Sequence, residues 1–250
     1  MAISGIDEPG VAGAFAAVRS GDVEGLRKLL HEHPGLVTKS FGSEHDRARG
    51  MGRTLLHVAT DWPGHFPRGV ETVTALIDAG ADVNARFSGP HTETPLHWAA
   101  SSDDVGVIDA LLDAGADIEA RGAVIGGGTA MADATAFGQW SAARRLLERG
   151  ATTSRWEASA LGLLGRVEAG FADDPQAWVD DATPCLWGAC HGGHLDVAEY
   201  LVGRGADPNW IGWDDLTSLD VAERAGAADV AAWLRKIGAK SAAELGDRLR

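Results

Sequence analysis

Apolar residues recur along much of the chain with the spacing of one helical face. The clearest set, at positions i, i+1, i+4 and i+5, is Val107, Ile108, Leu111 and Leu112. This spacing predicts a helix with one buried side. The small pair Ala99-Ala100 comes shortly before it and is typical of a helix that lies close to its neighbours. Neither helix can bury its apolar side alone, so the pattern predicts stacked helix pairs.

A Gly-Ala-(Asp) sequence returns along the chain at fixed points of this pattern. Its glycines are 35, 35, 55 and 33 residues apart, and they are Gly80, Gly115, Gly150, Gly205 and Gly238. A threonine starts a Thr-x-x-x segment upstream of each copy, and these threonines are Thr54, Thr94, Thr129, Thr183 and Thr217. The order is the same in every copy, so the chain contains an internal repeat.

Two further segments lack the Gly-Ala-Asp sequence but match each other at an offset of 141 residues. Residues 15–21 align with residues 156–162, and Pro34 aligns with Pro175. The later segment fills the 55-residue interval. We therefore expect seven units, beginning near residues 11, 53, 93, 128, 154, 182 and 216. They are expected to form one array over residues 11–240 with tails at 1–10 and 241–250, and the only expected articulation is the acidic stretch 173–181.

The best preserved unit begins Thr94-Pro95-Leu96-His97 and runs to Gly115-Ala116-Asp117. It resembles the ankyrin repeat, a unit of about 33 residues with a β-turn and two helices, whose consensus begins T-P-L-H-x-A. The later segment Gly193-His194-Leu195-Asp196-Val197 strengthens the resemblance. The chain is thus similar to bacterial-type ankyrin-repeat proteins with about seven degenerate repeats. The implied fold is an all-α solenoid, in which helix pairs and β-turn fingers stack into one curved array.

The charge of the chain narrows its expected partners. Its 250 residues hold 22 Lys and Arg against 36 Asp and Glu, which gives a net charge of −14. Nucleic acids are disfavoured because they bind through neutralisation of phosphates, whereas basic proteins and cationic molecules are favoured. The N-terminus has no basic start followed by an apolar run, and no apolar stretch reaches ~18 residues. A soluble cytoplasmic protein without a membrane partner is expected.

The two cysteines, Cys185 and Cys190, are five residues apart on a predicted helix. This separation places them on different faces and excludes a local disulfide. Small buried side chains are expected rather than redox chemistry. No metal-ligand spacing and no cofactor fingerprint occurs, so neither a metal nor a cofactor is expected.

The resemblance implies structural roles for three of the nine histidines. His57 and His97 occupy the consensus histidine, which in ankyrin-like repeats bonds the backbone of the adjoining repeat. His194 lies in the turn between two helices. Other residues fill the consensus position in the remaining units, namely Phe15, Ala132, Trp156, Leu186 and Asp220. Large aromatic rings at this position are expected to stack on the neighbouring repeat.

Partners of ankyrin-like stacks contact the fingers and the concave face of the first helices. Carried over position by position, the resemblance predicts a binding surface rich in tryptophan and carboxylate. Its residues are Trp62, Phe66, His91, Glu93, Trp98, Phe137, Trp187, Trp210, Trp213 and Asp214. Exposed tryptophan is often covered by a partner. The alternative for Trp98 and Trp187 is that their rings only fill space between first helices.

Two irregular segments stand out. The second unit carries an insertion, Pro63–Pro67, whose prolines predict fixed positions for His65 and Phe66 at the groove rim. An ordinary surface loop is the alternative. The segment Ile125–Thr129 has three glycines before a helix start and predicts a flexible finger turn. Anion binding is the alternative there, although no P-loop lysine follows.

Two functions remain open at this point. The first is an ankyrin-repeat binding scaffold whose acidic, tryptophan-rich concave groove and fingers hold a protein partner. The second is a site for a cationic or aromatic small molecule, or an enzyme with hydrolase-type or isomerase-type acid–base chemistry, near Asp61, His65, Trp98 and Asp133. The catalytic candidates would be Asp61, His65, Asp133 and His191. No motif identifies a reaction, so binding is favoured over catalysis.

Overall fold

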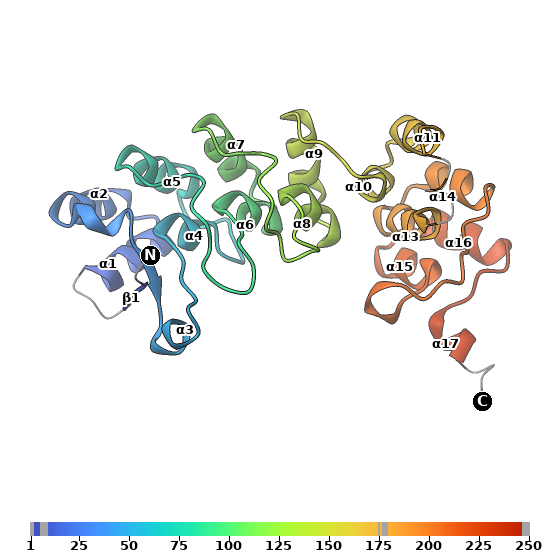
Figure 1. The fold of residues 1–250 in the computed structure, drawn as a ribbon, viewed down its shortest axis with the longest axis horizontal. Helices are drawn as coiled ribbons and strands as arrows, with labels where there is room; N and C mark the ends of the chain where they lie inside the picture. The colour runs from blue at the N-terminus through green and yellow to red at the C-terminus, as the bar shows by residue number, and fades with distance from the viewer. Residues whose placement is uncertain (1–2, 6–9, 175, 177–179, 247–250) are drawn as a thin grey trace. The chain divides into compact units, whose positions relative to one another are not determined.

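The computed structural model describes residues 3–5, 10–174, 176 and 180–246. They are mostly helical and divide into two compact units, Met1–Ala151 and Thr152–Arg250 (Figure 1). In both units the helices are stacked in pairs, so the predicted all-α class of stacked helix pairs is confirmed. We call the two members of each pair the first and the second helix. The two units are treated separately below.

The described part of the first unit contains four helix pairs. They are α1 (Val11–Ser20) with α2 (Val23–Glu32), α4 (Leu55–Thr60) with α5 (Gly69–Asp78), α6 (Pro95–Ser101) with α7 (Val105–Asp113), and α8 (Ala130–Ala136) with α9 (Trp140–Glu148). The first helices pack on one another in chain order, and so do the second helices. Each pair thus buries its apolar side against the next one.

An N-terminal strand and the loop between the first two pairs form a small accessory structure in this unit. Strands β1 (Ile3–Gly5) and β2 (Ser40–Gly42) pair in parallel. The short helices η1 (Pro34–Leu36) and α3 (Glu44–Ala48) flank β2. This structure lengthens the first loop between pairs well beyond the loops that follow it.

The second unit contains three helix pairs within its described residues. They are α10 (Arg155–Ala160) with α11 (Leu164–Ala172), α13 (Ala182–Gly192) with α14 (Leu195–Val202), and α15 (Ser218–Arg224) with α16 (Ala228–Lys236). The short helices η2 (Trp213–Asp215) and α17 (Ala242–Gly246) precede and follow the last pair. Helix α13 packs on both α10 and α15 and forms the centre of the unit.

The division between the units falls at residues 151 and 152, upstream of the acidic stretch 173–181. That stretch lies inside the second unit, and Pro175 and residues 177–179 of it lie outside the described residues. A single array over residues 11–240 and the exact repeat boundaries therefore stay predictions.

At three of the five units with the repeated threonine, at Thr54, Thr94 and Thr217, that threonine has a local role, because it takes part in a capping box at the start of the first helix. The hydroxyl of Thr54 accepts from the backbone N–H of His57, and the imidazole returns a contact to the backbone N–H of Thr54. Thr217 and Asp220 form the same reciprocal pair at α15. Each such capping box satisfies N–H groups that a helix start otherwise leaves without partners.

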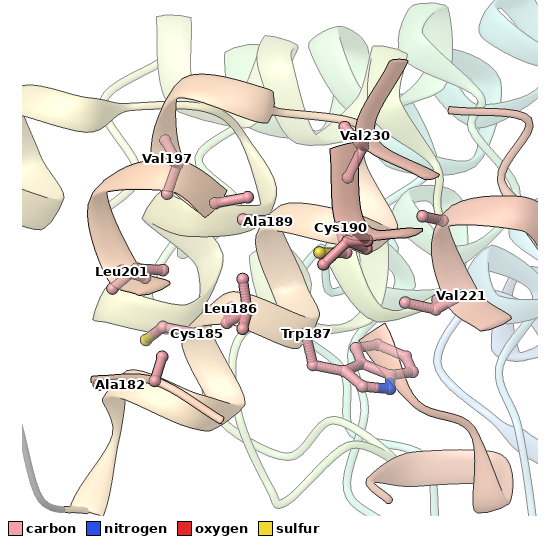
Figure 2. Packing of buried hydrophobic residues seen from close by; sticks show 14 of the residues in the cluster. Ala182, Cys185, Leu186, Trp187, Ala189, Cys190, Val197, Leu201, Val221 and Val230 are labelled. Carbon is pink, nitrogen blue, oxygen red and sulfur yellow. The ribbon is translucent and has the colours of Figure 1, made fainter. Parts of the chain in front are cut away.

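The core of the second unit surrounds α13. Figure 2 shows Leu186 and Cys190 of α13 in one buried cluster with side chains of α14 and α16, including Leu201 and Val230. Both cysteines are buried, and burial raises the pKa of the Cys185 and Cys190 thiols to about 12. The thiols are therefore protonated and poorly reactive at neutral pH.

Candidate functional site

Two buried histidines join neighbouring helix pairs of the first unit. The His57 ring accepts a hydrogen bond at Nδ1 from the backbone N–H of Thr54 (3.3 Å), so its proton lies on Nε2. That N–H donates to the carbonyl of Glu93 in the next pair (3.1 Å). His97 makes the equivalent bond to the carbonyl of Gly128 (3.4 Å). Burial lowers the pKa of both rings to about 4, so both are neutral at pH 7 and hold the pairs together.

The second unit makes this connection with tryptophan. Leu186 replaces the histidine, and the indole N–H of Trp187, one residue later, donates to the carbonyl of Leu216 (3.1 Å). Leu216 directly precedes the capping threonine of the next pair, as Glu93 and Gly128 do in the first unit. The accepting carbonyl thus has the same place in the repeat, while the donor changes from imidazole to indole.

Four indoles pack together in the second unit, and we call Trp156, Trp187, Trp210 and Trp213 the tryptophan cluster. Trp213 meets the other three edge to face, with ring centroids 5.8 Å from Trp156, 5.2 Å from Trp187 and 5.5 Å from Trp210. This edge-to-face geometry is favourable for aromatic pairs. Trp187 is only 4% exposed, whereas Trp213 is 50% exposed. The cluster therefore presents one ring to solvent and supports it with the others.

The surrounding elements hold this cluster in place. Trp156 of α10 lies against Gly188 of α13, where a side chain would come within 3.0 Å of the indole nitrogen. The loop before α15 carries Trp210 and Trp213. It turns through Asp214 and Asp215, which adopt φ angles of 56° and 57°. Asp214 forms an ion pair with Arg224 (2.7 Å). Acidic side chains therefore border the exposed indole.

A second aromatic group lies in the first unit. Trp98 is half-buried, and its ring centroid is 5.0 Å from that of His57 and 5.6 Å from that of Phe87. A hydrogen bond from Trp98 lowers the pKa of Glu93, but burial has the larger effect and raises that pKa overall. Glu93 is buried rather than presented to a partner.

Asp133 lies at the position in α8 that Trp98 occupies in α6. Its side chain is 0% exposed. Oδ1 accepts a long hydrogen bond from the backbone N–H of Ile125 (3.4 Å), and Oδ2 accepts none within the described part of the chain. Burial raises the pKa of Asp133 to about 7, and the charge of Glu93 contributes in the same direction. Among the described residues, no other carboxyl group has a pKa shown to depart as far from its ordinary value.

Two exposed aromatic side chains occupy equivalent positions in the first unit. Trp62 and Phe137 each lie eight residues after a capping threonine, at the ends of α4 and α8. Trp62 is 77% exposed and Phe137 is 48% exposed. Helix α6 packs between α4 and α8, and its equivalent residue is Ser102. The two rings thus occupy equivalent places in the repeat, with one pair between them.

The insertion Pro63–Pro67 forms the turn between α4 and α5. The backbone N–H of His65 donates to the Asp104 carboxylate in the next pair (3.0 Å). On the other side, any side chain at Gly21 would collide with the Pro67 carbonyl. Contacts with both neighbouring turns fix the insertion, and they leave His65 exposed and Phe66 half-buried.

Comparison with known protein families agrees with this architecture. A family model of ankyrin repeats in three copies matches residues 14–122 and 69–155, which together make up more than half of the chain. The chain belongs to the ankyrin-repeat family. A model of a single ankyrin repeat also matches residues 181–212. No curated protein matches the chain. Ankyrin repeats generally mediate protein–protein interactions.

The four catalytic candidates of this ankyrin-repeat chain have different neighbours. Asp61 forms an ion pair with Arg53 (2.9 Å), and burial raises the pKa of Asp61 while Arg53 opposes that shift. His65 and Asp133 have the separate surroundings described above. His191 belongs to the second unit, where its ring lies 5.4 Å from that of Trp187. None of the contacts described for these four residues assembles an acid–base pair.

The remaining predicted residues also have assigned places. The His194 ring lies against Gly162, where any side chain would collide with it, so it packs on the preceding repeat. His91 is partly buried in its finger, and Asp214 is exposed. The glycine turn before Thr129 directs the Ile125 N–H to Asp133, so this donor is already engaged by a carboxylate.

Sequence reasoning did not find the apolar exposure on the fingers. Val124, Ile125 and Ile211 are all exposed large hydrophobic residues. No sequence signal distinguishes these three residues from core residues. Their exposure depends on how far the next repeat extends over them.

One hollow of the second unit includes Trp156, a member of the tryptophan cluster. A cleft of about 440 Å³ is lined by Thr153, Ser154, Arg155, Trp156, Asp181, Pro184 and Cys185. The Arg155 guanidinium is already paired with Asp174 and Asp181 there. The cleft therefore offers no free cation to an anionic ligand.

The described part of the chain holds no group of three or more His, Cys, Asp or Glu side chains placed to bind a metal ion. None of its helices combines the length and the apolar character needed to cross a membrane.

Proposed function

We propose that this ankyrin-repeat protein is a binding scaffold that holds a basic segment of a protein partner, with the tryptophan cluster as its main contact. The observation that carries the proposal is the half-exposed Trp213 on a base of three other indoles. Rigid, well-supported tryptophan is the residue type most enriched where interfaces gain their binding energy.

The electrostatics favour a basic partner. Asp214 and Asp215 are exposed beside Trp213, and the whole chain carries a net charge of −14. The exposed Asp214–Arg224 ion pair is worth at most about 1 kcal/mol, so a partner's arginine or lysine can replace it at little cost. The face of an exposed indole also attracts cations.

The first unit offers a second contact for the same kind of partner. Trp62 and Phe137 are separated by one intervening helix, which places them about 16–20 Å apart if each packing step is 8–10 Å. A segment of about six extended residues spans this distance. An extended basic segment with apolar residues at its two ends would therefore fit this face.

A peptide library displayed on phage provides the test. We expect selected peptides to be rich in Arg and Lys, and Trp213→Ala to weaken their binding by more than about 1 kcal/mol, roughly fivefold or more. Ile237→Ala is the matched control because Ile237 is also an exposed apolar residue of the second unit but lies outside the cluster. Binding that is equally strong in Trp213→Ala, or selection of acidic peptides, would contradict the proposal.

The second candidate function is a site for a small cationic molecule in the first unit. One observation favours it, namely the buried, incompletely hydrogen-bonded carboxylate of Asp133 near Glu93. Catalysis has no comparable support, because the four candidate side chains have separate neighbours.

A further inference from the structure

Two carboxylates from neighbouring repeats are buried in the same region of the first unit. Glu93 immediately precedes the capping threonine of α6, and Asp133 lies in the first turns of α8, which packs on α6. Glu93 is 7% exposed and Asp133 is 0% exposed. Buried carboxylates are rare unless a cation or a full set of hydrogen bonds compensates them.

The compensation of Asp133 is incomplete. Its Oδ1 accepts only the long bond from Ile125, and its Oδ2 accepts no hydrogen bond in the described part of the chain. Glu93 has its bond from Trp98. A donor with several N–H groups would satisfy the unused acceptor positions of both side chains.

The neighbouring charged groups leave this need unmet. The guanidinium of Arg86 donates to the carbonyls of Thr92 and Arg121 in the fingers. His97 is neutral, because its pKa is lowered to about 4. His91 acts on Glu93 only through its charge, and the one charge found to act on Asp133 is that of Glu93, which repels it. Glu93 and Asp133 therefore lack a neutralising positive charge, and one bound cation would supply it.

A glycine-rich finger, residues 122–128, covers Asp133. Its ends are held by neighbouring elements, because the Gly128 carbonyl accepts from His97 (3.4 Å), the Gly122 carbonyl accepts from the Thr92 N–H (3.2 Å), and Ala123 is buried. The exposed tip, residues 124–127, is held by backbone bonds within the finger, such as the one from the Gly127 N–H to the Ala123 carbonyl (3.1 Å). Its tip residues Val124 and Ile125 are 43% and 40% exposed, so the tip is poorly packed. Displacing the tip alone therefore costs little buried apolar surface.

We propose that Glu93 and Asp133 form a binding site for one organic cation, an alkylguanidinium or alkylammonium group, which enters when the tip 124–127 moves aside; this inference deepens the second candidate function. The guanidinium of arginine is the better fit, since its planar set of N–H donors matches carboxylate oxygens. The half-buried Trp98 ring beside Glu93 adds an aromatic neighbour that favours a cation.

The proposal makes binding depend on pH in one direction. A bound cation stabilises the ionised form of Asp133, so binding releases a proton while Asp133 is protonated. With its pKa near 7, the ionised fraction rises about tenfold between pH 6 and pH 8, and the affinity is expected to rise by the same factor.

The test uses the full chain and two matched probes, N-acetylarginine amide and its uncharged isostere N-acetylcitrulline amide. We expect the arginine probe to bind with a dissociation constant of about 1 mM and to shift the backbone amide NMR signals of Ile125 and Gly126. Affinity should rise about tenfold from pH 6 to pH 8. The citrulline probe should cause no saturable shift.

Variants show which groups carry the binding. Asp133→Asn and Glu93→Gln should each abolish saturation by the arginine probe, whereas Glu148→Gln, which removes an exposed acid of α9, should leave it unchanged. Equal binding of both probes, or binding unaffected by Asp133→Asn, would overturn the proposal. NMR spectra of the free variants verify that they remain folded.

The site is independent of the tryptophan cluster, so the two proposals can fail separately. Trp213→Ala should not alter binding of the arginine probe. A second experiment adds a basic peptide that was selected on the cluster and follows the arginine probe through the amide signal of Ile125. Competition between peptide and probe would assign the cation to a side chain of a protein partner. Absence of competition would assign it to a free small molecule. Either result keeps the site, and only loss of probe binding removes it.

Discussion

The two units of this ankyrin-repeat chain join their helix pairs through different donors and one shared kind of acceptor. In the first unit, the rings of His57 and His97 donate to the carbonyl before the next capping threonine. In the second unit, the indole of Trp187 reaches the equivalent carbonyl of Leu216. The comparison teaches that the loss of the consensus histidine does not imply loss of the connection, because a larger donor one residue later can take its place.

The replacement also changes which side chains pack around the connection. An imidazole at the consensus position is fully enclosed, as for His57. An indole one position later carries a large ring to the first-helix face, where Trp187 packs with Trp156 and Trp213. The unit that departs most from the consensus is therefore the one that builds the aromatic cluster.

The largest effect is expected when the histidine connection in the first unit is removed. His57→Ala should destabilise this unit by roughly 3 kcal/mol, because it removes a buried ring, its bond to Glu93 and its contact with Thr54. Amide hydrogen exchange in α4 and α6 measures the change. A loss below about 1 kcal/mol would show that the histidine connection is unimportant here.

A pH-dependent effect is expected next. The folded-state pKa of Asp133 is raised to about 7, so its favourable contribution exists in acid and is lost as pH rises through that value. Asp133→Asn should therefore stabilise the first unit by roughly 2–3 kcal/mol more at pH 8 than at pH 5. Urea unfolding of both proteins at the two pH values measures this difference.

The two buried histidines act in the opposite direction in both proteins. Their pKa is lowered to about 4, so the stability they contribute is lost as pH falls below about 6.5. Their contribution cancels when Asp133→Asn is compared with the natural sequence at the same pH. An equal effect of the substitution at pH 5 and pH 8 would show that Asp133 does not titrate in this range.

The smallest effect tests the indole connection by itself. Trp187→Phe keeps most of the apolar volume but removes the N–H that bonds Leu216, so a loss of roughly 1 kcal/mol is expected. Hydrogen exchange at the start of α15 reports it, with Trp233→Phe as a control in α16. If both variants lose the same stability, the effect comes from volume and the hydrogen bond contributes nothing.

The repeat itself could be predicted from the sequence because threonine caps, apolar spacing and Gly-Ala turns are local signals. The roles of His57 and His97 follow from the same consensus. The burial of Trp187 and Glu93 could not be predicted, since each depends on the distance to the next repeat. The division at residues 151 and 152 also has no local signal, because the Gly150-Ala151 turn there resembles the others.

The acceptor that joins neighbouring repeats is a main-chain oxygen, which no point mutation can delete. A lineage can therefore exchange the donating side chain, or shift it along its helix, and still keep adjacent modules attached. Sequence likeness erodes under such exchanges while the scaffold persists, and repeats with unlike donors can be spliced together. Engineers who assemble repeat arrays gain a second type of joint, one whose buried indole supports a neighbouring exposed one.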